Sequence, residues 1–401
     1  MRALRFAWRS LVRQPARAFL GVLGVAAVGA LLFDMLMLLD GLIVSMRDML
    51  ERTGFDIRIT ASGDLRRMGD RMHHTDATLA TIRQLPHVGT VLAVRFVAAE
   101  AAPPEDTIAT NAPEPGMVAL TLEGVQGDAR PWTVLSGRDP AGDREVVVSR
   151  ALADAVRVTT GSELVVRARC TSPDQVLPPA RLHVVGIAEF PFELVGDPTA
   201  GGAMAVLDTA CAGRSDESDI ILASALDEVD ATAAAIRAAR PDVNVATNEQ
   251  VIGRLQRNGF TYFRQISSVL TVVTLAFALL LITVLLTVSV NQRLGEIAAL
   301  RALGFSRRRV VADVLCESVL IVGLGGLVSL PLGAVLARGL DAILKTMPGI
   351  PGQMYFFVLE PSTLGLHATL LAVTAIAAAL YPMQIVARLP IAATLRNEVL
   401  S

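Results

Sequence analysis

Four long apolar runs set the strongest constraint on how this 401-residue chain can fold. They cover residues 18–44, 269–290, 311–337 and 364–387. A helix needs about 20 mostly apolar residues to cross the ~30 Å hydrocarbon core of a bilayer, and each run is long enough. Hydrophobic residues make up 52% of the chain and charged residues only 18%, which is typical of a membrane protein with a polar domain attached. The sequence therefore predicts four transmembrane helices.

Arginines in the short segments beside the runs predict how these helices are oriented. Five precede the first run, five lie between the second and third, and two follow the fourth. The segment between the third and fourth runs has only Arg338 and Lys345. By the positive-inside rule both termini are then cytoplasmic, and residues 45–263 lie outside. A cleaved signal peptide is the alternative interpretation of the first run, but the run is longer than the apolar core of such a peptide.

Residues 45–263 have the pattern of a soluble domain, with strand-like runs broken by Gly, Pro and Asp. Two predicted helices, residues 75–85 and 226–240, each stand between two strands and each end at a proline. This weak repeat suggests one lobe built from both ends of the domain, with a β-rich lobe inserted at about residues 123–211. The expected fold class is α+β, with four transmembrane helices and a two-lobed α/β domain between the first and second.

The N-terminal arginines recur at spacings of three and four, which places them on one face of a helix. That helix either lies on the inner leaflet as an amphipathic segment or serves only as a topology signal.

Together these patterns divide the chain into nine segments. They are a cytoplasmic amphipathic helix at 1–17, the first transmembrane helix and its stalk at 18–44, the outer domain at 45–263, the second transmembrane helix at 264–290, a cytoplasmic loop at 291–310, the third helix at 311–337, a short outer loop at 338–363, the fourth helix at 364–387 and a cytoplasmic tail at 388–401.

The sequence lacks the motifs of common enzymes and metal sites. It has no phosphate-binding P-loop, no H-E-x-x-H and no G-x-S-x-G, and its three cysteines lack metal-ligand spacing. We therefore expect no enzymatic activity, no cofactor and no metal on this chain. Cys170 and Cys211 can form a disulfide if their domain faces an oxidising compartment, but the sequence does not show whether they meet. The outer domain shows no aromatic cluster or basic groove that would name a ligand.

Three acidic residues within the runs, Asp34, Asp40 and Glu317, are candidates for function because charge inside a membrane is costly. At about 1.5 Å per residue, Asp34 lies about 25 Å from the inner face and so near the outer interface. Asp34 and Asp40 are expected to mark the exit of a helix that continues outward as a stalk. Glu317 is expected to be shallow enough to pair with an arginine at the inner face. A proton relay needs several such groups at mid-depth, and His367 near the outer end of the fourth run does not supply one.

Two stretches around the third run carry a family resemblance. RLGEIAALRALGFSRRR at residues 293–309, followed by VLCESVLIVGLGGLVSLPLG, resembles the signature of FtsX/MacB-type permeases of ABC transporters. The opening ALRFAWRSLVRQPARAFLGVLGV is similar to the usual start of that family, and EVVVSRALADAVRVTTGSELVV and RLHVVGIA are similar to its outer-domain strands. The resemblance covers nearly the whole chain, and the order of the motifs around four spans is its most specific feature.

The resemblance implies a subunit of the bacterial cytoplasmic membrane that works with a separate ABC ATPase, which binds the ATP and Mg. A second permease subunit completes a homo- or heterodimer, and a periplasmic adaptor or lipoprotein-binding protein is a further partner in some members. Membrane lipid is a partner and nucleic acid is not. The implied role is export or extraction of a hydrophobic substrate such as a lipoprotein, lipid or peptide by mechanotransmission. The alternative is a non-transporting FtsX-like regulator that acts on an outer partner such as a cell-wall hydrolase.

The charged stretch between the second and third runs contains the predicted contact with the ATPase. Residues 295–303 can form a helix that is too short to be stable alone, so it must dock on a partner. The ATPase-coupling residues are Gly295, Glu296, Ile297, Leu300, Arg301, Leu303 and Gly304. Among them Glu296 and Arg301 suit the two ends of the helix dipole, and Gly304 suits a left-handed stop. Arg307, Arg308 and Arg309 follow at the start of the next helix, where lipid phosphates or an acidic partner surface would hold them.

Overall fold

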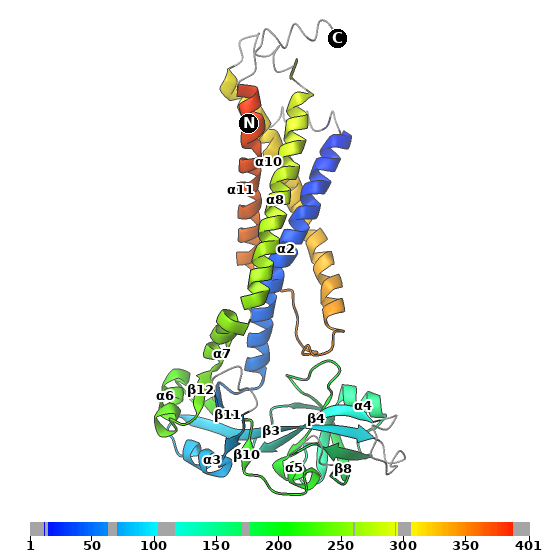
Figure 1. The fold of residues 1–401 in the computed structure, drawn as a ribbon, viewed down its shortest axis with the longest axis vertical. Helices are drawn as coiled ribbons and strands as arrows, with labels where there is room; N and C mark the ends of the chain where they lie inside the picture. Colours follow the sequence, from blue (N-terminus) through cyan, green and yellow to red (C-terminus); the bar gives the residue numbers. More distant parts are fainter. Residues whose placement is uncertain are drawn as a thin grey trace. The chain divides into compact units, whose positions relative to one another are not determined.

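The computed structural model describes Val12 and residues 15–62, 70–102, 117–170, 177–259, 261–292, 294–295 and 306–387. The chain forms two compact units (Figure 1). The helical unit contains residues 1–44, 260–343 and 355–401, and the α/β unit contains residues 45–259 and 344–354. The predicted amphipathic helix at 1–17 lies outside the described residues, apart from Val12 and the first turn of the first long helix.

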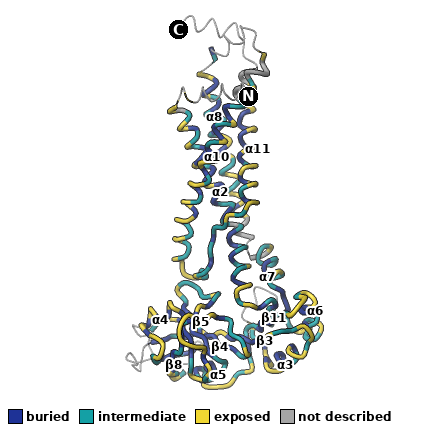
Figure 2. Tube along the Cα trace, turned by 180° about the vertical axis from the view of Figure 1, so that it is seen from behind, coloured by how far each residue is buried: buried dark blue, intermediate teal, exposed yellow. Residues whose placement is uncertain are grey.

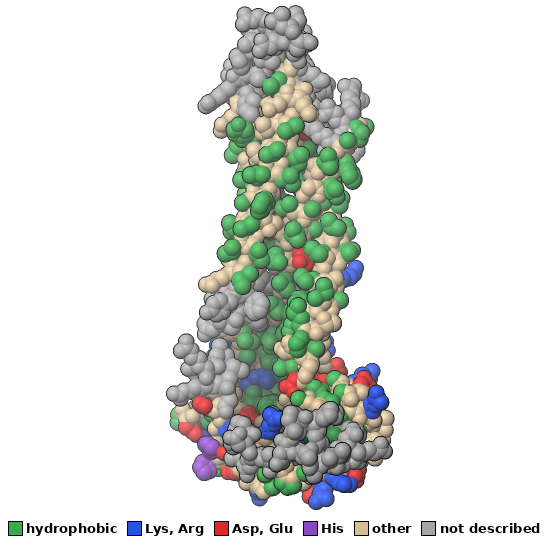
Figure 3. All heavy atoms as spheres, turned by 45° about the vertical axis from the view of Figure 1, so that its right-hand side comes forward, with side chains coloured by type: hydrophobic (Ala, Val, Ile, Leu, Met, Phe, Trp, Pro, Cys, Tyr) green, Lys and Arg blue, Asp and Glu red, His purple; other side chains and the backbone are tan. Residues whose placement is uncertain are grey.

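Four long helices of the described chain are apolar enough to cross a membrane, as the sequence predicts. They are α2 (Pro15–Arg52), α8 (Thr261–Asn291), α10 (Arg307–Leu344) and α11 (Pro361–Ala387). Apolar side chains such as Val272, Phe277 and Leu280 remain exposed along them, and Figure 3 shows hydrophobic side chains spread over their surface. Exposed apolar surface of this extent suits contact with lipid. Both α2 and α10 continue past their predicted ends at residues 44 and 337, because the few charges that follow do not interrupt helix formation.

The α/β unit is built on one ten-stranded mixed sheet with the order β12-β1-β11-β3-β4-β9-β6-β8-β5, in which β7 pairs with β3 and β8. Its strands are β1 (Ile57–Thr60), β3 (Val88–Ala102), β4 (Val118–Gln126), β5 (Thr133–Gly137), β6 (Glu145–Ser149), β7 (Glu163–Ala168), β8 (Ala180–Glu189), β9 (Thr199–Ala203), β11 (Ile220–Ala225) and β12 (Asn244–Thr247). A separate pair joins β2 (Met72–His73) to β10 (Glu217–Ser218). The helices are α3 (Thr75–Arg83), α4 (Arg150–Val156), α5 (Met204–Ala210), α6 (Val229–Ala239), α7 (Asn248–Arg254) and the π-helix η3 (Leu255–Gly259).

The described part of this unit has three hydrophobic cores, one of which, around Phe55, Trp132 and Phe190, draws on strands of both lobes. The other two cores correspond to the two lobes. One packs α3 and α6 on β1, β11 and the start of β3, so it is made from both ends of the domain. The other joins α4 and α5 to strands from the later part of β3 through β9. The long strand β3 passes from one core to the other, because its first half pairs with β11 and its second half with β4 and β7. Figure 2 shows the buried stretches of these strands in dark blue.

The second lobe contains a disulfide. Cys170 follows β7 and Cys211 follows α5, and the structure pairs them with their Cα atoms 5.6 Å apart. The pairing answers the question that the sequence leaves open, and it closes a loop of 41 residues.

Close contact between α2 and α10 holds the helical unit together. A Cβ atom built on Gly325 would lie 2.6 Å from Cβ of Val25, and one built on Gly333 would lie 2.9 Å from the Phe33 ring. No real Cβ atom tolerates such distances, so these helices meet only because α10 has no side chain there. Gly323, two residues before Gly325, has no atom within 4 Å of such a Cβ.

This difference predicts opposite effects for one added methyl group. Gly325→Ala should destabilise the helical unit by about 1–3 kcal/mol, because α2 and α10 must separate. Gly323→Ala should stabilise it by up to about 1 kcal/mol, because alanine has the better helix propensity. The measurement is the temperature of unfolding of each variant in detergent. Equal shifts for the two variants would contradict the close packing of α2 on α10.

Candidate functional site

The predicted ATPase contact lies almost entirely outside the described residues. Of its residues the structure describes only Gly295, which is helical and buried. The others, Glu296, Ile297, Leu300, Arg301, Leu303 and Gly304, fall in the undescribed segment. Arg307, Arg308 and Arg309 form the first turn of α10, and their side chains are not described. The coupling helix therefore stays a prediction.

The structure places the side chain of Asp34 inside the helical unit, which does not test the depth that the sequence predicts for it. It is only 3% exposed, and its Oδ1 atom has no hydrogen-bond partner among the described residues. On the same turn of α2, Phe33 lies against Gly333 of α10 and against the ring of His367 of α11, at 5.2 Å between centroids. Position along a helix gives depth, but it does not show which face the neighbouring helices cover.

The other two acidic residues of the runs bond to hydroxyl groups on neighbouring helices. Thr363 of α11 donates a hydrogen bond of 2.5 Å to Asp40 of α2. Ser289 of α8 donates one of 3.0 Å to Glu317 of α10. The arginine partner predicted for Glu317 falls at the inner face, where the side chains of the first turn of α10 are not described. Both acids therefore link helices, which is a structural role for charge inside the helical unit.

A third polar pair joins α10 to α11. Ser329 Oγ lies 3.0 Å from Nε2 of His367, and both residues are buried. An apolar cavity of about 480 Å³ lies beside His367, between these two helices. The lining is hydrophobic apart from this histidine, so the cavity lacks the series of ionisable groups that proton transfer would need.

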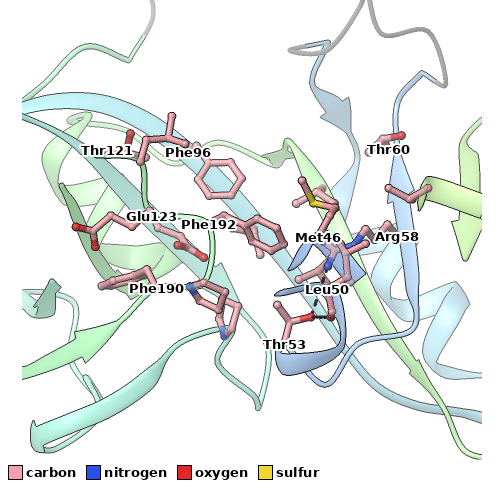
Figure 4. A pocket seen from close by; sticks show the side chains of 18 of the residues that line it. Met46, Leu50, Thr53, Arg58, Thr60, Phe96, Thr121, Glu123, Phe190 and Phe192 are labelled. Atoms are coloured by element: carbon pink, nitrogen blue, oxygen red, sulfur yellow. Dashed lines mark hydrogen bonds between the residues drawn. The ribbon is translucent and has the colours of Figure 1, made fainter. Parts of the chain in front are cut away.

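The α/β unit contains the larger cavity, of about 590 Å³, which we call the sheet cavity (Figure 4). Its floor is one face of five adjacent strands. Successive strand residues point to opposite faces of a sheet, so every second residue reaches the cavity while its neighbours enter the cores below. The floor residues are Asn244 and Ala246 of β12, Arg58 and Thr60 of β1, Ile220 and Leu222 of β11, Val94 and Phe96 of β3, and Thr121 and Glu123 of β4.

Three segments form the walls of the sheet cavity. Met46 and Leu50 come from the last turns of α2, and Leu255 comes from η3. The third wall is the loop of residues 190–197, which contributes Phe190 and Phe192. Figure 4 shows these two phenylalanine rings beside Phe96. The expectation that the outer domain lacks an aromatic cluster is therefore wrong, because residues about 95 positions apart in the chain converge only after the sheet has formed. In the sequence, the short spacing of Phe190 and Phe192 is the only local indication of this aromatic cluster.

Acidic side chains gather at one side of the sheet cavity. Glu123 is 7% exposed, and burial raises the pKa of its carboxyl group to about 8. Burial, assisted by the nearby charge of Asp197, raises the pKa of Glu193 to about 7. Asp197 itself accepts a hydrogen bond of 3.1 Å from Thr121. At neutral pH Glu123 therefore holds a protonated carboxyl group in an apolar setting.

Basic side chains lie on the opposite side of the floor. Arg58 donates hydrogen bonds to Asn248 and Thr53, and its guanidinium lies 5.3 Å from the centre of the Phe192 ring. Burial lowers the pKa of Arg58 to about 10, so it remains charged at neutral pH. Arg254 of α7 donates to Asn244 at 3.2 Å. The strand order places Arg58 three strands away from Glu123, so the cavity has an acidic side, an apolar middle and a basic side.

A short segment between α10 and α11 is part of the α/β unit and holds the 190–197 loop. Val195 donates a backbone hydrogen bond of 2.8 Å to Ile350, Gly349 donates one of 2.9 Å to Val195, and Gly352 donates one of 3.0 Å to Glu193. These bonds make a two-residue antiparallel bridge between Leu194 and Pro351. The 344–354 segment therefore fixes the loop that carries Phe192 and Glu193.

Comparison with known protein families agrees with this architecture. The MacB-like periplasmic core domain matches residues 18–241, and the FtsX-like permease C-terminal domain matches residues 268–391. The first match alone covers more than half of the chain. The chain belongs to the FtsX/MacB family of ABC transporter permeases. It is accordingly a multi-pass bacterial membrane protein, and a permease of this family is a membrane subunit and in general not itself an enzyme.

Two solved structures are similar to parts of the permease. The extracellular domain of the noncanonic ABC-type transporter YknZ from Gram-positive bacteria is 14% identical, with a TM-score of 0.32, and the match covers 48% of this chain and 98% of that one. The periplasmic region of MacB from Actinobacillus actinomycetemcomitans is 12% identical, with a TM-score of 0.37, and the match covers 53% and 98%. No curated protein matches the permease. The family assignment rests on the two domain matches.

The buried carboxyl group of Glu123 predicts how stability depends on pH. Its pKa rises from 4.5 in the unfolded chain to about 8 in the folded permease, so the folded state keeps a proton that the unfolded state loses. The associated cost is absent below pH 4.5 and grows as the pH rises towards 8. Glu123→Gln removes the cost, which is on the order of 3 kcal/mol at pH 7. The stability advantage of the variant should therefore be near zero at pH 4.5 and largest near pH 8.

Thermal unfolding of the α/β unit, followed at pH 5 and pH 8, measures this difference. Glu228→Gln is the control, because Glu228 is an exposed carboxylate of the same unit that does not line the sheet cavity. Identical pH profiles for wild type and Glu123→Gln would show that Glu123 is solvated.

Proposed function

We propose that this permease is the membrane subunit of an ABC-type export or mechanotransmission complex of the bacterial cytoplasmic membrane. It works with a separate ATPase, which binds ATP and Mg, and with a second permease subunit. Both termini are cytoplasmic, and the α/β unit lies on the outer side. The substrate is hydrophobic, of the class of lipoproteins, lipids and peptides. The observation that carries the proposal is that the walls of the sheet cavity are continuous in the chain with the membrane helices.

Three such continuities support transmission of motion to the cavity. The last turns of α2 supply Met46 and Leu50, so one helix belongs to both units. The π-helix η3 supplies Leu255 and ends two residues before α8 begins. The 344–354 segment follows α10 and is bonded to the 190–197 loop. A shift of α2, α8 or α10 along its axis therefore moves one wall of the cavity.

The sheet cavity also favours handling of a ligand over the alternative of an FtsX-like regulator. A regulator needs an outer surface that contacts its partner, whereas an apolar cavity with a few buried polar groups is typical of a site for a small molecule or a chain segment. The size of the cavity and the raised pKa values of its carboxyl groups are typical of a ligand site, and a purely mechanical contact requires neither.

Copurification tests the ATPase contact. Leu300→Asp places a charge in the middle of the predicted apolar stripe of the coupling helix, and a tagged full-length permease with this change should lose its ATPase partner, because a carboxylate is costly in an apolar groove. Ala298→Asp is the matched control, since residue 298 lies on the opposite face of the same helix. The measurement is ATP hydrolysis by the material purified from the native host. Equal loss in both variants, or no loss in Leu300→Asp, would remove the predicted coupling site.

The bridge at Pro351 gives a test of transmission. Gly352→Pro removes the N–H group that bonds to Glu193, whereas Gly352→Ala keeps it, and a Cβ there would have its nearest contact at 3.8 Å. Trp132 reports on the loop, because its ring lies 5.5 Å from that of Phe190. In a Trp8→Phe background Trp132 is the sole tryptophan, and its fluorescence change on addition of ATP to the complex should fall by more than half in Gly352→Pro.

Gly352→Ala should keep the fluorescence change, and a disulfide between Leu194→Cys and Pro351→Cys should restore it in the Gly352→Pro variant. Paired residues of an antiparallel bridge have Cα atoms about 4.5–5.5 Å apart, within the range of a disulfide. A full response in Gly352→Pro without the disulfide would exclude the 344–354 segment as the route of transmission.

A further inference from the structure

We infer that the sheet cavity binds a cationic amphiphile, with its amine beside Glu123 and its apolar body against Phe96 and Phe192. The inference deepens the proposed function by naming the class of ligand. The inference rests on the proposed function only for the claim that the ligand is the transported substrate. Binding itself requires neither ATP nor an ATPase.

The size and lining of the cavity suit a ligand of this kind. Its volume of about 590 Å³ falls within the range of roughly 300–1,000 Å³ that is usual for sites of drug-sized molecules. Aromatic and aliphatic side chains fill the middle of the floor and the loop wall, and Phe96 and Phe192 keep 44% and 39% of their surface exposed. Large apolar side chains that remain open inside a cavity gain free energy when a ligand covers them.

One carboxyl group at the acidic side of the cavity lacks a partner among the described residues. Glu123 is more than nine-tenths buried, it lines the cavity, and its carboxyl group makes no hydrogen bond or ion pair with any described residue. A buried polar group without a partner costs free energy that a ligand can recover. Glu193 and Asp197 stand on the same side of the cavity, and Asp197 accepts a hydrogen bond from Thr121. An ammonium group beside Glu123 forms an ion pair with its carboxylate, whereas an uncharged group can only exchange a hydrogen bond with it.

The basic side, by contrast, is already satisfied. Arg58 bonds to Asn248 and Thr53 and lies over the Phe192 ring, and Arg254 bonds to Asn244. A guanidinium held by such neighbours attracts an anionic ligand less than a free one does. The two sides are three strand spacings apart, about 14 Å, which keeps a bound ammonium group away from both arginines.

The inference has a consequence for protons. The charged groups that line the cavity are Arg58, Glu123, Glu193, Asp197 and Arg254. In the empty cavity the raised pKa of Glu123 keeps its carboxyl group protonated at neutral pH. An adjacent ammonium group favours the carboxylate, so the binding of an amine should release a proton from Glu123. A neutral or anionic ligand should release none.

A matched set of soluble probes tests the charge preference. The full-length permease with Trp8→Phe, in lipid nanodiscs and without ATP, is titrated at pH 7 with 4-phenylbutylamine, 4-phenylbutanol and 4-phenylbutanoate, and Trp132 fluorescence reports binding. The phenylbutyl group is the same in all three probes, so its contribution to partition into the lipid is the same for each of them. We expect the amine to bind at least 10-fold more tightly than the alcohol, with the carboxylate weakest. Tightest binding by the carboxylate would overturn the inference, and equal binding of all three would show an apolar void only.

Two substitutions identify the group that holds the amine. Glu123→Gln should weaken amine binding at least 10-fold, leave binding of the alcohol within about 3-fold, and abolish the proton release, which an indicator dye measures in weak buffer. Glu228→Gln should change none of these. Unchanged amine affinity in Glu123→Gln would overturn the assignment of Glu123. Because no ATPase is present, this result is independent of copurification: a permease that binds the amine but no ATPase would contradict the proposed function alone.

Discussion

Within a bilayer no water is available to the backbone, so each crossing segment must bond to itself. This requirement makes α2, α8, α10 and α11 continuous helices, and it leaves the α/β unit connected to them only through chain that enters or leaves a helix. The chain passes between the two units at four points. Two of them lie at the last turns of α2 and after the π-helix η3, and the other two are the ends of the 344–354 segment, which backbone hydrogen bonds join to the 190–197 loop.

The sheet cavity follows from the alternation of side chains in the sheet. In the lobe built from both ends of the α/β domain, α3 and α6 cover one face of the sheet, and the residues of that face form a hydrophobic core. The opposite face carries Phe96, Leu222 and Glu123, and the end of α2, the π-helix η3 and the 190–197 loop cover it. An apolar floor with carboxyl groups at one side is costly to maintain in an empty protein, as the raised pKa of Glu123 shows.

The sequence predicts more of the fold than of the site. Apolar runs, arginine placement and the strand pattern around residues 57–60 and 181–189 suffice for the four helices and the inserted domain, because these signals are local. The cavity depends on which strands become neighbours: Phe96 meets Phe192 only because β3 lies beside β4 and the 190–197 loop folds over both. Asp34 illustrates the same limit inside the membrane, where helix length gives depth and the packing of neighbouring helices decides exposure. The coupling residues around Glu296 remain a prediction from sequence.

The disulfide between Cys170 and Cys211 limits how far the chain between these two residues can be extended. The 190–197 loop lies between these two cysteines, so it belongs to a covalently closed ring. The 344–354 segment is bonded to that ring from outside it. A force on the loop can displace it only as far as this ring allows. Strands β8 and β9, which flank the loop, lie within the same ring, so their separation from each other along the chain is limited as well. The 344–354 segment is thus attached to a stretch of chain whose extension has a fixed limit.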